Sequence, residues 1–259
     1  MSVLTLQLAG PLQSWGTSSR FASRRTTENA PTKSGVIGLL AAAQGLERNA
    51  DLSALTALRF GVRIDQPGTQ LRDFHTAHHS DTTAAMPLSE RYYLADAVFV
   101  AAVSGDHHLL TALHTALRTP AYLPFLGRRS CPPSRPLELT VHDGAELEDA
   151  LRTEPWRASH WYQQRRHDAK VTLTTLTEPS PSPSPSPSPA TATATATASS
   201  IGGGAAADTL RDQPLSFDPR HRRYALRTVH TSTVSVPNPC ARPHRERPAH
   251  DPVSHLESA

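Results

Sequence analysis

The chain has 259 residues and a formal net charge of +3, and of its 26 basic residues all but Lys33 and Lys170 are arginine. Guanidinium forks suit phosphate or base contacts, although a GC-rich genome would leave the same bias. Two cysteines, Cys131 and Cys240, are too few for a disulfide framework or a zinc site, so we expect a cytoplasmic protein. The longest largely apolar run, residues 36–43, is far shorter than the ~20 residues that span a bilayer, and we expect no membrane association.

Residues 2–8 alternate apolar and polar side chains and predict a first strand, which Ala9-Gly10-Pro11 ends. The loop that follows carries polar, aromatic and basic residues: Gln13, Ser14, Trp15, Arg20, Arg24 and Arg25. Proteins hold single-stranded nucleic acid by stacking and charge, so this loop is a candidate RNA contact. A Trp15 ring folded back onto the core fits the sequence equally well.

Residues 31–46 predict a short helix that is buried nearly all round. Thr32 or Ser34 can cap its start, and Gly45 can take the left-handed position at its end. The small residues Gly35, Gly38 and Ala42 would let a sheet pack closely against it.

The start of this helix offers unpaired backbone N–H groups, and Lys33 and Ser34 beside them would suit a phosphate. An ordinary capped core helix is the alternative interpretation. A Walker nucleotide-binding loop is not expected, because Glu28 and Thr32 stand at its glycine positions.

Further along the chain, periodicity predicts a strand at 58–65, a strand at 93–103, an amphipathic helix at 105–117 and a strand at 137–141. With the first strand and helix, this order is typical of an α+β protein with a ferredoxin-like, split βαβ domain, as in RNA-recognition modules. We assign residues 1–135 to this domain and residues 67–95 to an inserted thumb.

Residues 136–236 predict a small C-terminal β-rich subdomain with a helix at 143–151 and strands at 171–176 and 222–229. Within it, residues 178–207 contain Pro-Ser and Ala-Thr repeats and glycines, which are typical of a solvated linker. We expect the Pro-, His- and Arg-rich tail, residues 237–259, to be disordered.

Three groups of residues could carry chemistry or bind a ligand. His75, His78 and His79, with Asp73, could share a metal if they lay on one face of a helix. The segment does not look helical and no further ligand set is evident, so we expect no metal and no cofactor. His75 with Tyr92 and Tyr93 could instead perform metal-free acid–base chemistry on a ribose hydroxyl. A glycine turn at Gly127 carries Arg128 and Arg129 and would suit phosphate.

Four blocks, residues 8–16, 31–40, 73–76 and 126–132, resemble in order and spacing the CasD family, the subtype I-E members of the CRISPR-associated RAMP superfamily. The resemblance covers about residues 2–135. It implies a non-catalytic subunit of the Cascade complex that binds the 5′ handle of CRISPR RNA, caps the backbone filament and contacts the backbone and large subunits in antiviral defence. The alternative is a metal-independent endoribonuclease that processes precursor CRISPR RNA.

Transferred onto this chain, the resemblance implies an RNA-binding set drawn from the loop, the helix start, the thumb and the glycine turn. The set is Gln13, Ser14, Trp15, Lys33, Ser34, His75, Arg91, Arg128 and Arg129. The low-complexity segment and the long tail depart from the family pattern.

Overall fold

The computed structural model describes residues 1–16, 23–180, 206–218 and 220–241. Arg20, most of the predicted linker and most of the predicted tail lie outside these residues. The helices are α1 (Lys33–Ala43), α2 (Ser53–Thr56), α3 (His107–Arg118), α4 (Leu147–Thr153) and α5 (His160–Gln164). The strands are β1 (Ser2–Ala9), β2 (Leu12–Gln13), β3 (Arg24–Arg25), β4 (Arg59–Gln66), β5 (Thr69–His75), β6 (Ser89–Ala95), β7 (Val98–Gly105), β8 (Glu138–Asp143), β9 (Lys170–Thr177), β10 (Ala206–Ser216) and β11 (Arg223–Pro237).

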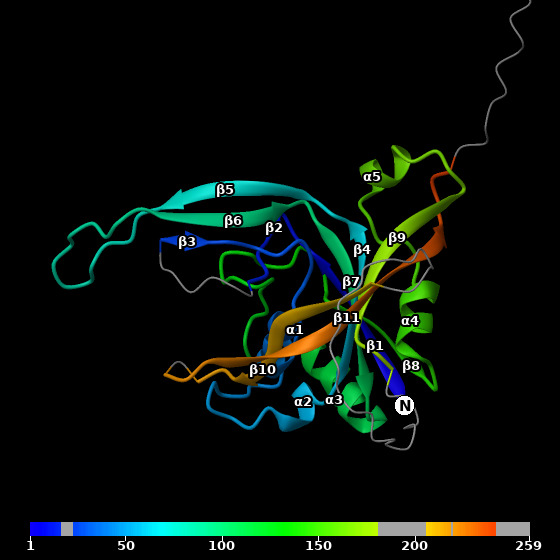
Figure 1. The fold of residues 1–259 in the computed structure, drawn as a ribbon, viewed down its shortest axis with the longest axis horizontal. Helices are drawn as coiled ribbons and strands as arrows, with labels where there is room; N and C mark the ends of the chain where they lie inside the picture. The colour runs from blue at the N-terminus through cyan, green and yellow to red at the C-terminus, as the bar shows by residue number, and fades with distance from the viewer. Residues whose placement is uncertain (17–22, 181–205, 219, 242–259) are drawn as a thin grey trace, which may run out of the picture.

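A seven-stranded antiparallel sheet in the order β10-β11-β9-β4-β7-β1-β8 forms the body (Figure 1). β1 pairs with both β7 and β8, so β7 separates β1 from β4, and β1 separates β7 from β8. The units β1–α1–β4 and β7–α3–β8 therefore interlock in one sheet, in a mixed α+β fold.

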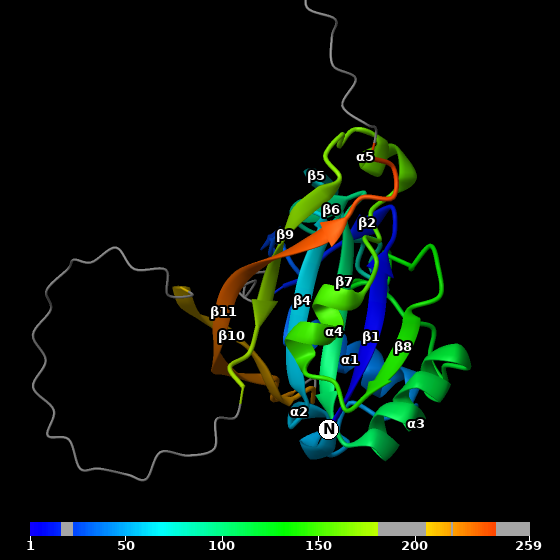
Figure 2. The same cartoon turned by 90° about the vertical axis from the view of Figure 1, so that its right-hand side faces the viewer.

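The two faces of the sheet carry separate apolar cores. On one face, Leu4 and Phe99 pack with Ile37 of α1 and Leu110 of α3. On the other face, Val3, Val100 and Ala102 pack with Leu147 and Leu151 of α4, and Figure 2 shows α4 lying across the sheet on the side opposite α1. Because both faces are covered, β1 is buried along its whole length.

The C-terminal strands extend the same sheet. β9 pairs with β4, β11 with β9 and β10 with β11, while β8 pairs with β1 at the opposite edge. The predicted division at residue 135 does not coincide with a break in this sheet. β10 was not predicted, because its sequence lacks a clean apolar alternation and contains Pro214.

Helix α1 has the predicted ends. Thr32 is its N-cap and accepts a hydrogen bond from the Gly35 N–H at 3.2 Å, and Gly45 follows with φ 78°. The expectation that its small residues face a sheet needs correction. A Cβ on Gly35 would lie 2.8 Å from the Trp15 ring, and one on Gly38 would lie 3.6 Å from Phe217.

The predicted insertion is a β-hairpin, the thumb, which projects from the body (Figure 1). Its strands β5 and β6 pair along their length, and β2 and β3 pair with the other edge of β6. The single strand expected over residues 93–103 is two strands, because Asp96 has a φ of 56° and turns the chain between β6 and β7. No helix in the described ranges is long and apolar enough to cross a membrane.

Candidate nucleic-acid interface

Alternation along β6 places Arg91 and Tyr93 on one face of the thumb. Arg25 of β3 pairs with Arg91, and the guanidinium of Arg128 lies over the Tyr93 ring with its Cζ 4.7 Å from the centroid. These four residues, Arg25, Arg91, Tyr93 and Arg128, are called the arginine face below. Three arginine residues thus lie next to one another, although they come from a strand pair and a turn far apart in the sequence.

Arg128 is held in place by its turn. Gly127 has a φ of 82°, and a Cβ there would lie 1.7 Å from the carbonyl oxygen of Ser14. The Ser14 N–H donates to Leu126 O at 3.1 Å, which fixes the turn against the loop. Arg128 Nη2 donates to Arg25 O at 2.9 Å. Only a glycine allows this approach, so the turn dictates where Arg128 points.

The arginine face has unused donors. Arg91 Nε and Arg128 Nη1 are both buried from solvent and have no hydrogen-bond acceptor among the described residues. A buried N–H without an acceptor is costly, because it has lost its water without a replacement. An anionic oxygen placed on this face would supply what is missing.

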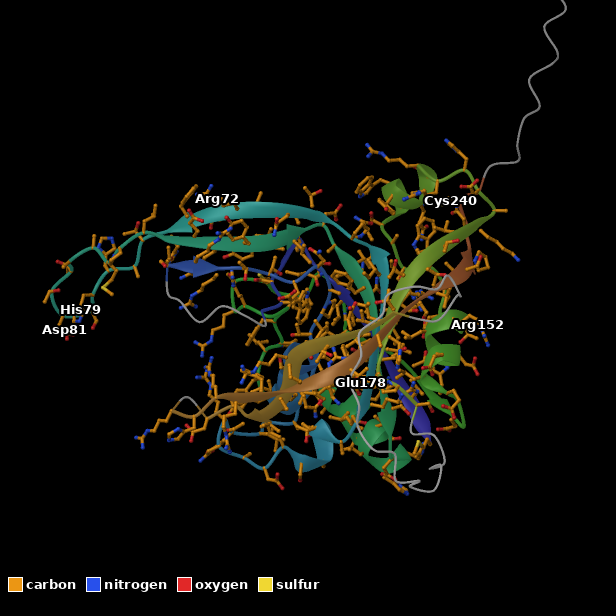
Figure 3. The ribbon with its side chains drawn as sticks, viewed as in Figure 1. Arg72, His79, Asp81, Arg152, Glu178 and Cys240 are labelled. Carbon is orange, nitrogen blue, oxygen red and sulfur yellow. The ribbon has the colours of Figure 1, made fainter. Side chains whose placement is uncertain are left out.

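The opposite face of the thumb is also cationic and aromatic. Arg24 Cζ lies 5.3 Å from the Tyr92 ring centroid, and Arg72 Cζ lies 4.7 Å from that of Phe74. Arg72, labelled in Figure 3, also pairs with Glu90. Here a carboxylate forms an ion pair with an arginine. On the arginine face, Asp73 of β5 lies across from Arg91 of β6 but forms no ion pair with it within 4 Å.

Three predicted RNA contacts are buried. Gln13 and Trp15 are fully buried and Ser14 is 3% exposed. Gln13 Nε2 donates to Leu8 O at 3.0 Å and to Ala97 O at 2.8 Å, while its Oε1 accepts from Trp15 Nε1 at 3.1 Å. Of the two interpretations left open for Trp15, the structure shows the ring folded onto the core. These side chains therefore position the turn through contacts within the chain.

The helix start does not offer a phosphate site. The Lys33 N–H donates to Asp212 Oδ2 at 2.8 Å, so a carboxylate of the chain itself occupies the N-terminus of α1. The Lys33 amine is buried and forms an ion pair with Glu178 at 3.0 Å. Burial lowers the pKa of Lys33 below its usual value, against the opposing effect of Glu178. Lys33 is therefore an internal ion-pair partner.

Lys33 belongs to a buried cluster of two cations and two anions that sequence reasoning missed. Arg227 donates two hydrogen bonds to the Asp212 carboxylate, from Nε at 2.5 Å and from Nη2 at 2.9 Å. Its Nη1 lies 3.6 Å from Glu178 Oε1. The Glu178 carboxylate also accepts from the Phe60 N–H at 2.9 Å. This charge cluster, Lys33, Glu178, Asp212 and Arg227, joins α1 to β10 and β11; Figure 3 labels Glu178 beside β11.

A groove of about 860 Å³ runs between α1, the segment 122–127 and the end of the β10–β11 hairpin. Ser34 and Arg129 line it, as does the edge of Trp15. Its further aromatic and basic lining consists of Arg48, Tyr122, Phe125, Phe217, Arg222 and Tyr224. The groove reaches Gly127, so the one turn presents Arg128 to the thumb and Arg129 to the groove.

The residues of the alternative nuclease centre are not brought together. His75 is exposed and pairs with Ser89, whereas Tyr93 pairs with Leu71 and is buried beneath Arg128. Tyr92 points to the opposite face of the thumb, where it contacts Arg24. The described residues contain no group of three or more His, Cys, Asp or Glu side chains arranged for a metal ion.

Comparisons with known proteins agree with this fold. The family described as CRISPR-associated protein (Cas_Cas5) matches residues 3–230. The chain is 37% identical over 171 residues to "CRISPR system Cascade subunit CasD" of Escherichia coli strain K12, covering 58% of this chain and 75% of that protein.

Two solved structures are similar over most of their length. One, described as "Crystal structure of Cas protein", has 34% identity and a TM-score of 0.62, covering 92% of this chain and 97% of that one. The other, a chain of "CRISPR RNA-guided surveillance complex", has 30% identity and a TM-score of 0.68, covering 94% of this chain and 95% of that one. These similarities confirm the resemblance seen in the four sequence blocks, and the chain belongs to the Cas5 family of CRISPR-associated proteins.

Proposed function

We propose that this chain is a non-catalytic, RNA-binding subunit of a Cascade-type CRISPR surveillance complex in the cytoplasm. It holds the 5′ handle of the CRISPR RNA, caps the backbone filament and contacts the backbone and large subunits. The similarity to a Cascade subunit and to a chain of an RNA-guided complex supports the assignment. The observation that carries it is the pair of buried, acceptor-free N–H groups on Arg91 and Arg128.

The arginine face is suited to the phosphates of the handle. Arg128 is stacked on Tyr93 and tied to Arg25, so little side-chain entropy remains to be lost when it binds. A phosphate oxygen would satisfy the donors that the protein leaves without an acceptor. His75 of β5 lies on the same face of the thumb as Arg91, closer to the tip of the hairpin. There it can contact the same strand of RNA.

The groove is suited to the bases. Besides the buried Trp15, four aromatic side chains and three arginines line it, which is the combination that binds unstacked bases of single-stranded RNA. Its volume falls in the range of about 300–1,000 Å³ that ligand sites occupy. Arg129 and Ser34 of the predicted set lie in this groove, and the other lining residues extend it.

The interlocked strand order supports the ferredoxin-like architecture as part of this proposal. β4-β7-β1-β8, with α1 and α3 on one face, is the arrangement that two split βαβ units produce. The proposed thumb, residues 67–95, then lies between the second and third strands of that core.

Changing Arg91 or Arg128 to alanine is expected to weaken binding of RNA that carries the handle. Each lost phosphate contact should also reduce the slope of log K against log salt by about 0.7 to 1. Fluorescence anisotropy across a salt series measures both quantities. Arg152→Ala is the matched control, because Arg152 lies on α4 and pairs with Asp149, away from the thumb (Figure 3).

Equal slopes for all three variants would remove the arginine face from the proposal. The same samples, run on a denaturing gel in chelator, test the alternative. Specific cutting that His75→Ala abolishes would replace binding with endoribonuclease activity, although the geometry of His75, Tyr92 and Tyr93 does not favour it.

A further inference from the structure

The segment around α5 concentrates positive charge on the surface. The basic and aromatic exposed side chains of this segment, called the α5 surface below, are His160, Trp161, Arg165, Arg166, His167 and Lys170. Gln164 and the carboxylate Asp168 are exposed beside them. Arg157 nearby is neutralised by Glu154 at 3.1 Å. By contrast, no carboxylate in the described ranges lies within ion-pair distance of Arg165, Arg166 or Lys170. Asp168 offsets one of these charges without forming an ion pair. The remaining like charges repel one another, and a bound polyanion would relieve this repulsion.

Aromatic rings are interleaved with these cations. Arg165 Cζ lies 4.8 Å from the Trp161 ring centroid, and Arg166 Cζ lies 5.6 Å from that of Tyr162. Trp161 is 45% exposed, so part of its indole remains open to a ligand. A large exposed aromatic side chain beside arginines is the pattern on which nucleic-acid bases stack.

Hydrogen bonds from buried side chains hold the backbone of the α5 surface in place. Asn238 Nδ2 donates to Arg166 O at 2.8 Å and to Asp168 O at 3.2 Å. The buried Gln163 side chain donates from Nε2 to Trp156 O at 2.7 Å. These bonds hold the backbone that carries the arginines, so the charges are presented in a set arrangement and less ordering is needed on binding.

This surface is separate from the groove and the charge cluster. α5 precedes β9, whose first residue is Lys170, whereas Glu178 of the charge cluster directly follows the last residue of β9. Eight residues of strand span about 25 Å. Figure 1 shows α5 at the end of β9 away from α1.

We propose that the α5 surface is a second binding site, for single-stranded nucleic acid. It goes beyond the handle site and does not depend on it. Single strands are favoured over duplexes because an indole needs an unstacked base as its partner. They are favoured over an acidic protein segment because carboxylates would neutralise the arginines but leave the exposed indole unused.

The probe is a fluorescein-labelled oligouridine of twelve nucleotides that lacks any handle sequence, titrated into the full chain. Trp161→Ala/Arg165→Ala is expected to lower its affinity about tenfold or more. Arg118→Ala, which removes one exposed charge at the end of α3, should leave it within about twofold. In a chain that already carries Arg91→Ala and Arg128→Ala, the Trp161→Ala/Arg165→Ala change should still lower the affinity for oligouridine about tenfold.

A second readout is specific to this surface. The chain has three tryptophans, of which Trp15 and Trp156 are buried, so quenching by oligouridine should come from Trp161 and disappear in Trp161→Phe. Unchanged affinity of the α5 variant, an equal loss in Arg118→Ala, or tighter binding of a duplex of the same length would overturn the proposal. The handle-RNA titration would be unaffected by that failure, because its variants, Arg91→Ala and Arg128→Ala, lie on the arginine face.

Discussion

Replacing Asp212 with alanine is expected to destabilise the folded chain by about 3–5 kcal/mol. Asp212 is fully buried, and its carboxylate accepts from Lys33 N at 2.8 Å and from Arg227 Nε at 2.5 Å. Without it, the charge cluster keeps two cations and one anion in the interior, and the first N–H of α1 loses its acceptor. Urea unfolding near pH 7 measures the change in free energy.

A double variant separates charge imbalance from lost contact. Asp212→Ala/Arg227→Met removes one anion and one cation, so Lys33 and Glu178 remain as a neutral pair. We expect this double variant to be more stable than Asp212→Ala alone, although it lacks more hydrogen bonds. If its loss equals or exceeds the sum of the two single losses, charge balance is not what the cluster contributes.

The local features of the fold could be predicted from the sequence. Thr32 and Gly45 bound α1 because capping and the left-handed glycine act within a few residues. β10 could not be predicted, since its stability comes from pairing with β11 and from contacts of Asp212 with α1. The break at Asp96 was missed because no glycine or proline marks it.

The candidate site was predicted only in part, for a similar reason. Arg128 and Arg129 were found because a glycine turn is a local signal. Lys33 was assigned to phosphate because its true partners, Glu178 and Asp212, lie 145 and 179 residues away. The groove was missed because its walls come from α1, the segment 122–127 and the β10–β11 hairpin, which periodicity cannot bring together.

Gly127→Ala is expected to reduce both stability and RNA binding. The new Cβ would have to move Ser14 O, which lies 1.7 Å from its position, and the backbone would have to leave its φ of 82°. The turn would then release the Ser14 to Leu126 hydrogen bond and carry Arg128 off Tyr93. We expect the unfolding free energy to fall by several kcal/mol. This loss exceeds the about 1–3 kcal/mol that a strained backbone alone would cost.

Gly144→Ala supplies the matched control, because Gly144 has a φ of 64° but nothing lies within 4 Å of a Cβ there. That variant bears the backbone strain without the collision, so it should lose only about 1–3 kcal/mol and bind handle RNA normally. RNA affinity measured on folded samples of both variants separates the two effects. If Gly127→Ala binds like Gly144→Ala, then the turn does not set the position of Arg128, and the arginine face must be held by Tyr93 and Arg25 alone.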